Sequence, residues 1–290
     1  MKARWLIVTV SLLPLFGAAS LSYHDEISKW RLEREEALRA DGGWLSVAGL
    51  FWLKEGANTI GTAANAAIRL PRGPARASVI EYRAGKAKLH AETGAGVTVN
   101  GKVVVTADLH SDANEAKPDR VQVGDVALFV IHRGQRDAVR MKDPQSAARV
   151  HFTGLHWYPI RDDYRVTAQW TAYDPPKTLS IPNVLGEVEQ TTGPGYASFK
   201  LNGQDCQLEP VVEDGQLFFV FKDQTAGKET YPAGRFLYAA MPKDGRVALD
   251  FNKAYNPPCA FTPFATCPLP TKQNRLPVRV EAGELNYGKH

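Results

Sequence analysis

Short runs in which apolar and polar residues alternate make up most of the chain after residue 43. Six of these runs are 66–70, 77–83, 87–91, 102–106, 126–132 and 165–172. Alternation with a period of two is typical of strands that bury one face. Arg83–Lys86 and Val99–Lys102, which separate some of the runs, contain glycine and are typical of hairpin turns. Because no long helical segments intervene, the pattern predicts a mainly β protein built from sandwiches or barrels.

One earlier stretch, from Asp25 to Ala40, has the period of an amphipathic helix instead. Its apolar residues fall on one face, and acidic and basic residues alternate around the rest: Ile27, Trp30, Ala37 and Leu38 form the apolar face. Asp25 is the expected N-cap, and Gly42-Gly43 the expected stop. We interpret the dense charges as a solvated face.

The first residues have the features of a secretory signal peptide. A basic start with Lys2 and Arg4 precedes an apolar run and the small residues 17–20. Cleavage near Ala19 removes two of the 35 basic residues and none of the 31 acidic ones, so the net charge falls to 33 − 31 = +2. We therefore expect a periplasmic or secreted protein without membrane insertion after cleavage, and a nearly neutral surface with no attraction for nucleic acid.

The predicted organisation is a signal peptide (1–19), an N-terminal helix (24–43), a β-sandwich (44–145) and a second β-rich domain (146–290) that contains a Pro- and Asn-rich loop. Residues 56–133 resemble a forkhead-associated (FHA) β-sandwich in four segments: 56–61, 68–71, 98–102 and 121–125. The resemblance implies the sandwich shape. It does not extend to phosphothreonine binding, because the segment from Ala75 to Ile80 lacks the histidine of the FHA phosphate-binding motif.

The loop at 250–276 is rich in proline and asparagine, and fixed irregular loops are where binding sites are often built. Together with two upstream regions, its motifs resemble the DUF1684 family: the matching segments are 43–45, 49–53, 221–225, 230–237, 250–252, 254–259, 267–270 and 274–276. This family has no established function, so the resemblance implies kinship and no particular chemistry.

Polar side chains in and near this loop form the best candidate site. We expect Asp250 and Asn252 to lie on one face of a strand, and Arg235 to serve as the partner of an anion. The candidate ligand-binding residues are Tyr231, Arg235, Asn252, Tyr255, Asn256 and Asn274. Asp223, Asp250 and Glu284 are candidate catalytic carboxylates. A structural interpretation remains open, in which Arg235 forms an ion pair with Asp250 and the asparagines satisfy loop carbonyls.

Metal binding and known catalytic motifs have little support. Asp223, Asp250 and Glu284 with Asn252 offer oxygen ligands for calcium, but no calcium-loop spacing occurs, and we expect no metal. Phosphate-loop, dinucleotide-binding and nucleophile-elbow motifs are absent from the sequence.

The chain has three cysteines. In an exported protein we expect Cys259 and Cys267 to form a disulfide and Cys206 to be a buried free thiol. The function that we expect is binding of a small polar or anionic ligand in the C-terminal domain. The alternatives are a hydrolase with Asp250 or Asp223 as general base, and a structural or partner-binding protein of the periplasm.

Overall fold

The computed structural model describes residues 22–113 and 117–288 and is mainly β, as predicted. The predicted signal peptide, residues 1–19, lies outside the described residues. Among those described, none of the helices is long and apolar enough to cross a membrane.

The predicted N-terminal helix is present as α1 (Tyr23–Arg39). Its N-cap is Ser22 rather than Asp25: the Ser22 hydroxyl accepts from the Asp25 amide, and the Asp25 carboxylate accepts from Ser22 in return. This reciprocal pair is a capping box, which satisfies amides that the first turn leaves without partners. Ile27 and Leu38 are buried as predicted, but Ala37 is exposed.

A first group of strands covers residues 47–142 and forms two sheets. One sheet has the order β1-β11-β10-β9-β6-β7 and the other the order β3-β2-β4-β5-β8. The bounds are β1 Val47–Trp52, β2 Gly56–Gly61, β3 Ile68–Arg69, β4 Ser78–Arg83, β5 Lys86–Ala91, β6 Thr98–Val99, β7 Lys102–Val103, β8 Thr106–Leu109, β9 Val121–Val123, β10 Val126–Arg133 and β11 Arg136–Lys142. All of the pairs are antiparallel except β2 with β3.

The two predicted hairpin turns are present between neighbouring strands. Asn100 and Gly101 have φ values of 51° and 80° and join β6 to β7, and Ala84 and Gly85 have the same left-handed conformation between β4 and β5. Two successive residues with positive φ match the twist of the strands, which explains why an Asn-Gly pair is favoured there.

A second group of strands covers residues 165–250. One sheet has the order β14-β13-β12-β18, and a smaller one the order β15-β16-β17. The bounds are β12 Arg165–Pro182, β13 Val188–Leu201, β14 Gln204–Leu208, β15 Val211–Glu213, β16 Gln216–Phe221, β17 Arg235–Ala239 and β18 Arg246–Asp250. The predicted strand 165–172 is thus only the first part of a long β12, which forms an extended hairpin with β13.

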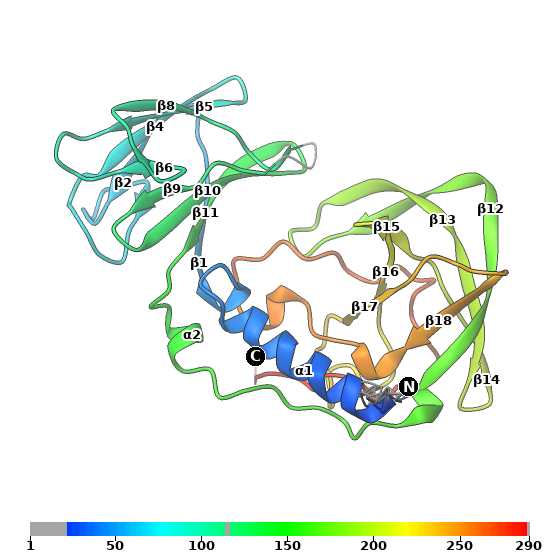
Figure 1. Cartoon of the computed structure of the whole chain (residues 1–290). Coiled ribbons are helices and arrows are strands. Elements are labelled where there is room, and N and C mark those ends of the chain that lie inside the picture. Colours follow the sequence, from blue (N-terminus) through cyan, green and yellow to red (C-terminus); the bar gives the residue numbers. More distant parts are fainter. Residues whose placement is uncertain (1–21, 114–116, 289–290) are drawn as a thin grey trace, which may run out of the picture.

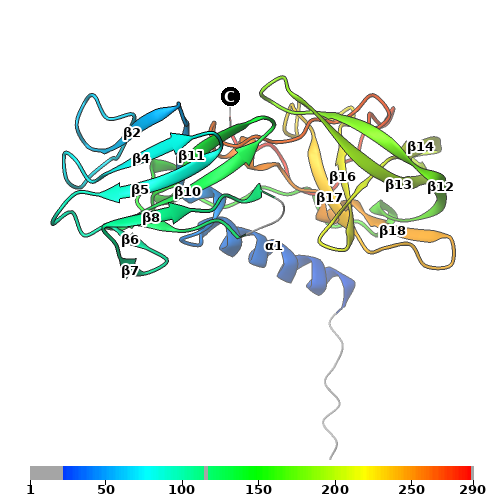
Figure 2. The same cartoon turned by 90° about the horizontal axis from the view of Figure 1, so that it is seen from above.

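The two groups of strands have separate hydrophobic cores, one built from residues between 60 and 141 and the other from residues between 164 and 282. Figure 1 shows them side by side, with α1 running below the space between them toward β18; Figure 2 gives the view from above. The short helices are η1 (Trp44–Ser46), α2 (Ala147–Val150), η3 (Asp162–Tyr164), η4 (Phe251–Lys253) and η5 (Pro258–Ala260).

The Pro- and Asn-rich loop connects these parts. After β18 it forms η4 and η5 and returns to the first group, where the Thr262 hydroxyl donates to the carbonyl of Val47 at 3.0 Å. Smaller apolar clusters join it to α1 and η1 on one side and to β16 and β17 on the other. The loop therefore lies between two separately packed bodies, in the position of an interface.

Candidate functional site

Arg235, the predicted anion partner, lies in the interior of the second group of strands. Its side chain is 1% exposed, and one Nη atom donates to Asp223 at 2.8 Å and to the carbonyl of Val280 at 3.0 Å. The other Nη atom donates to the carbonyl of Ala282, and the guanidinium lies over the Phe221 ring. Arg235 is therefore ion-paired, as the structural interpretation has it, but with Asp223 rather than with Asp250.

Both carboxylate oxygens of Asp223 also accept hydrogen bonds. One carboxylate oxygen accepts from the amide and the hydroxyl of Thr225, at 2.8 and 2.7 Å, and from the amide of Val280 at 3.2 Å. The other oxygen accepts from Arg235. A carboxylate with this many donors stabilises a turn and is poorly placed to accept a proton from a substrate.

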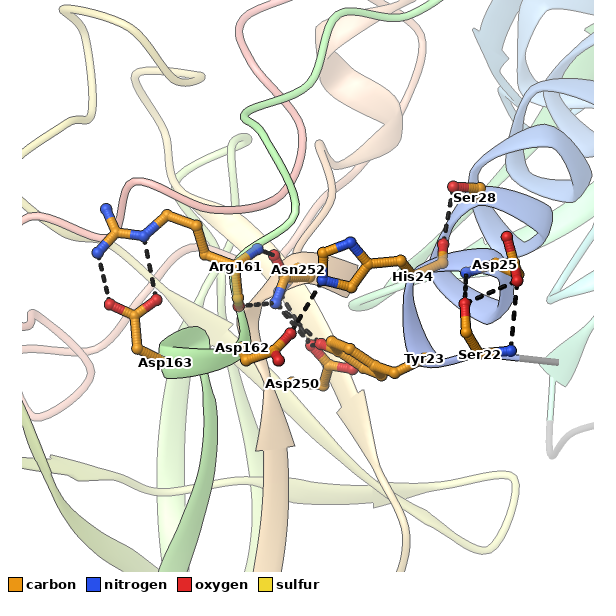
Figure 3. A network of polar contacts seen from close by, with 10 residues as sticks. All are labelled: Ser22, Tyr23, His24, Asp25, Ser28, Arg161, Asp162, Asp163, Asp250 and Asn252. Atoms are coloured by element: carbon orange, nitrogen blue, oxygen red, sulfur yellow. Dashed lines mark hydrogen bonds and ion pairs between the residues drawn. The ribbon is translucent and has the colours of Figure 1, made fainter. Parts of the chain in front are cut away.

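Asp250 and Asn252 meet each other, but through a turn rather than on one face of a strand. Asp250 caps η4, and the Asn252 amide donates to Tyr23 in α1, to the carbonyl of Arg161 and to Asp250 (Figure 3). The Tyr23 hydroxyl donates to Asp250 at 2.9 Å. In Figure 3 these side chains point toward the first turn of α1, so that the network fastens the helix to the second group of strands.

The other two predicted asparagines are buried in the loop. The Asn274 side chain exchanges hydrogen bonds with the backbone of Glu209 at 2.8 Å each and also donates to the carbonyl of Val220. Asn256 donates to the carbonyl of Leu285 at 2.7 Å, and its side-chain oxygen has no partner. Asn274 thus satisfies backbone groups, as the structural interpretation predicts, but those of Glu209 and Val220 outside the loop rather than the carbonyls of the loop itself.

The two predicted tyrosines have different surroundings. Tyr231 packs against an apolar cluster that includes Phe261, and burial raises the pKa of its hydroxyl. Tyr255 lines two neighbouring cavities, and burial raises the pKa of its hydroxyl to about 12. Of the six predicted ligand-binding residues, Tyr255 is the one that lines a major cavity in the part of the chain that the structure describes.

One of these cavities, which we call the junction cavity, lies where the first group of strands, the second group and the loop meet. Its volume is about 370 Å³. The lining residues are Arg34, Trp44, Arg133, Arg140, Glu213, Phe218, Phe236, Tyr238, Tyr255, Pro258, Thr266, Cys267 and Pro268. A second cavity of about 530 Å³ shares Arg34, Tyr238 and Tyr255 with it and extends toward Asp250.

Arg140, on β11, is the most unusual residue of the junction cavity. It is 8% exposed, its Nε and one Nη atom have no hydrogen-bond partner, and within residues 22–113 and 117–288 no carboxylate lies within ion-pair distance. Burial, assisted by the charge of Arg133, lowers its pKa to about 10. The guanidinium lies 5.0 Å from the centre of the Trp44 ring, an attraction that offsets only part of the lost hydration.

The other two arginines of the cavity have partners. Arg133 pairs with Asp112 at 2.9 Å and donates to the hydroxyl of Thr266. Arg34 donates to the carbonyl of Asn256 at 3.0 Å and stacks on Tyr255, with its guanidinium carbon 4.4 Å from the ring centre. Arg140 is therefore the lining arginine that has no ion-pair partner in the part of the chain that the structure describes.

Glu284 lies behind Arg34, completely buried. Its carboxylate oxygens have no partner with hydrogen-bond geometry, and one lies 3.6 Å from the Nε of Arg34. Burial raises its pKa to about 7, although Arg34 and Asn256 act in the opposite direction. Glu284, one of the three predicted catalytic carboxylates, lines none of the cavities described above.

The three cysteines are free thiols in this structure. Cys206 is buried, as predicted. Cys259 and Cys267 lie together, and the Cys259 amide donates to the sulfur of Cys267 at 3.2 Å. A hydrogen bond between the two thiols lowers the pKa of Cys259 and raises that of Cys267. The expected disulfide between Cys259 and Cys267 is not formed here, although the two side chains are in contact.

The candidate carboxylates do not gather into a metal site. Asp223, Asp250 and Glu284 belong to three separate networks. Within residues 22–113 and 117–288, no group of three His, Cys, Asp or Glu side chains could hold a metal ion. The calcium alternative therefore has no supporting geometry among these residues.

Sequence reasoning missed the partly or fully buried arginines of α1 and β11, two of which, Arg34 and Arg140, line the junction cavity. On α1, Arg31 and Arg34 occupy the positions between Ile27 and Leu38 where an amphipathic helix places apolar residues. They are half-buried instead of solvated, and both guanidinium groups lie over aromatic rings. Arg140 follows the apolar Ala138 and Val139 in β11. A charged residue inside an apolar stripe is the signal that could have found them.

Comparison with known proteins places the C-terminal part of the chain in a family. Residues 150–285 match DUF1684, a protein family of unknown function. The C-terminal part of the chain belongs to this family. The matched region contains every predicted site residue and part of the junction cavity, but Arg34, Trp44, Arg133 and Arg140 lie before it.

Parts of the chain are similar to solved structures. The solution NMR structure of an uncharacterised protein of Haloarcula marismortui is 32% identical, over 49% of this chain and 81% of that chain, with a TM-score of 0.41. The FHA domain of FhaA, crystallised with the intracellular domain of Rv3910, is 25% identical over 31% of this chain and 84% of its own, with a TM-score of 0.23. No curated protein matches the chain.

Proposed function

We propose that this protein binds a small anionic molecule in the junction cavity, with Arg140 as its principal partner. The observation that carries the proposal is that Arg140 is 92% shielded from solvent and still has no counter-ion among the described residues. Burial of a charge without a partner is strongly unfavourable. A bound anion would remove that penalty, and a guanidinium offers the paired donors that carboxylates and phosphates accept.

The hydrolase alternative has less support. Asp223 accepts hydrogen bonds from Thr225, Val280 and Arg235, and Asp250 accepts from Tyr23 and Asn252. Neither carboxylate is free to act as a general base. Arg140, by contrast, faces a cavity whose volume of about 370 Å³ lies within the range of small-molecule sites.

We also propose that the protein is exported and works in the periplasm or outside the cell. The support is the basic and apolar segment at residues 1–19. In an oxidising compartment the contact between Cys259 and Cys267 favours oxidation of the two thiols to a disulfide. Mass determination of the protein from a periplasmic fraction tests both points. A chain that starts at residue 1, or that keeps three free thiols, would contradict them.

The binding proposal is tested by calorimetric titration with three probe anions: acetate, benzoate and inorganic phosphate. Ionic strength is held constant, and Arg140→Met is compared with Arg136→Met. Arg136 lies on the same strand but is exposed, pairs with Glu187 and does not line the cavity. Loss of the guanidinium should weaken binding by about 2 kcal/mol or more, roughly 30-fold, only in Arg140→Met. Absence of binding by the wild type, or equal binding by both variants, would refute the proposal.

A further inference from the structure

We propose that the ligand of the junction cavity is a monocarboxylate carried on a flat aromatic ring, with the carboxylate on Arg140 and the ring against the aromatic wall of the cavity. This inference rests on the proposed function and names its ligand class. Two features carry it: the arrangement of aromatic side chains around the cavity and the balance of charges along its lining.

The aromatic wall consists of Phe218 from β16, Phe236 and Tyr238 from β17, and Tyr255 from the loop. Phe218 and Tyr238 are stacked, with ring centres 4.8 Å apart, and Tyr238 and Tyr255 are almost parallel, at an angle of 12° and 6.4 Å. Phe236 meets Phe218 edge to face at 4.9 Å. These contacts hold the rings in fixed orientations.

A wall in which Phe218, Tyr238 and Tyr255 are roughly parallel and Phe236 stands edge-on to them selects for shape as well as for apolar area. Aromatic rings prefer offset stacked or edge-to-face partners, and such pairs contribute beyond the area that they bury. Trp44 adds a further ring beside the guanidinium of Arg140. A flat ring joined directly to an anionic group can therefore contact the wall and Arg140 together.

The charges of the lining favour a ligand with a single negative charge. Arg133 is ion-paired with Asp112, and Arg34 lies 3.6 Å from Glu284, so that among the described residues Arg140 is the lining arginine without an ion-pair partner. Glu213 also lines the cavity and accepts from the Tyr238 hydroxyl at 2.7 Å. A dianion such as phosphate would meet this carboxylate without a second free cation, whereas a monocarboxylate needs only Arg140.

The volume of the cavity sets the size of the ligand. At about 370 Å³ it lies near the lower limit of small-molecule sites. One ring with its carboxylate fits this space, whereas a nucleotide or an oligosaccharide would extend beyond it. Benzoate is therefore a suitable probe, and cyclohexanecarboxylate, which has the same charge and a similar size, is its matched control.

The test is calorimetric titration of the wild-type protein with benzoate, cyclohexanecarboxylate, acetate and inorganic phosphate at constant ionic strength. We expect benzoate to bind about tenfold or more tightly than acetate and phosphate, and about threefold or more tightly than cyclohexanecarboxylate. Tyr255→Leu and Tyr238→Leu should reduce the preference for benzoate while leaving the affinity for acetate nearly unchanged.

The possible failures are distinguishable. If acetate or phosphate binds in an Arg140-dependent way and benzoate binds no more tightly, the inference about the ring is wrong and the anion site stands. If cyclohexanecarboxylate equals benzoate, the wall offers apolar area without selecting a flat ring, and the inference is again wrong. If none of the probes binds, or if Arg140→Met leaves benzoate binding intact, the proposed function fails with it.

Discussion

The interior of the second group of strands and the junction cavity each contain a buried arginine, and the two differ in what surrounds the charge. Arg235 is 1% exposed and donates to a carboxylate and two carbonyls. Arg140 is 8% exposed and has no carboxylate or carbonyl partner in the ranges that the structure describes. The two guanidinium groups are thus buried to a similar extent, but only the charge of Arg235 has a counter-ion among the described residues.

The difference separates a structural role from a binding role. A buried ion pair holds segments together, and removal of one partner leaves the other charge buried without a counter-ion. A buried charge without a partner destabilises the free protein, so a site that retains it favours a ligand that supplies the missing counter-ion. On this reasoning Arg235 holds the loop onto the strands, and Arg140 is open to a ligand.

The largest expected effect is that of Arg235→Ala. It leaves the Asp223 carboxylate buried without its cation, which should lower the free energy of unfolding by about 3–5 kcal/mol. Arg140→Ala, its counterpart in the junction cavity, removes an uncompensated charge and should leave stability unchanged or slightly higher. Denaturation in urea, followed by tryptophan fluorescence, measures both.

The double variant Arg235→Ala with Asp223→Asn serves as the control, since it removes the stranded charge and should recover part of the loss. If Arg140→Ala destabilises the protein as much as Arg235→Ala does, the contrast between the two regions disappears and Arg140 is a structural residue as well.

A second effect, nearly as large, concerns the pH dependence at Glu284. Its pKa is about 7 in the folded protein and about 4.3 in an unfolded chain. Between these values the folded state binds the proton and the unfolded state does not, so this group lowers stability as pH rises from about 4.3 to 7. Glu284→Gln removes the effect. Relative to the wild type, the variant should gain about 3 kcal/mol in unfolding free energy between about pH 4.5 and pH 8.

Unfolding curves of both proteins across this pH range provide the measurement. A difference between variant and wild type that stays constant with pH would show that Arg34 compensates Glu284 fully. In that case Arg34 would compensate the charge of Glu284 as Arg235 compensates that of Asp223, and the two buried carboxylates would not differ.

Much of the fold was predictable because local patterns determine it. The alternating runs gave strands in both groups, the Asn100-Gly101 pair gave its hairpin turn, and the helix near the N-terminus is present. The exact N-cap was not predicted, because Ser22 and Asp25 are both good capping residues and only their reciprocal hydrogen bonds show which one is the cap.

The candidate site was less predictable because it depends on contacts between distant segments. Polar residues concentrated in the loop suggested a ligand, yet Asn274 and Arg235 bind backbone and side chains of the protein itself. Whether a polar residue has a partner is decided by segments far away in the sequence. The same holds for Arg140, whose lack of a partner becomes visible only when β11 is placed against the loop and η1.

The smallest effect tests how far the anchored end of α1 influences the cavity. Ser22→Ala removes the capping box, which should lower the free energy of unfolding by about 1 kcal/mol. Ser28→Ala is the matched control: its exposed hydroxyl bonds only to the carbonyl of His24 within the helix, and alanine favours the helix there. Arg34 lies three turns beyond Ser22 and is held by Asn256 and Tyr255, so the affinity for benzoate should be the same in both variants. A weaker affinity in Ser22→Ala alone would mean that fraying of the first turn reaches the cavity, and that the network around Tyr23 belongs to the binding region as well as to the structural one.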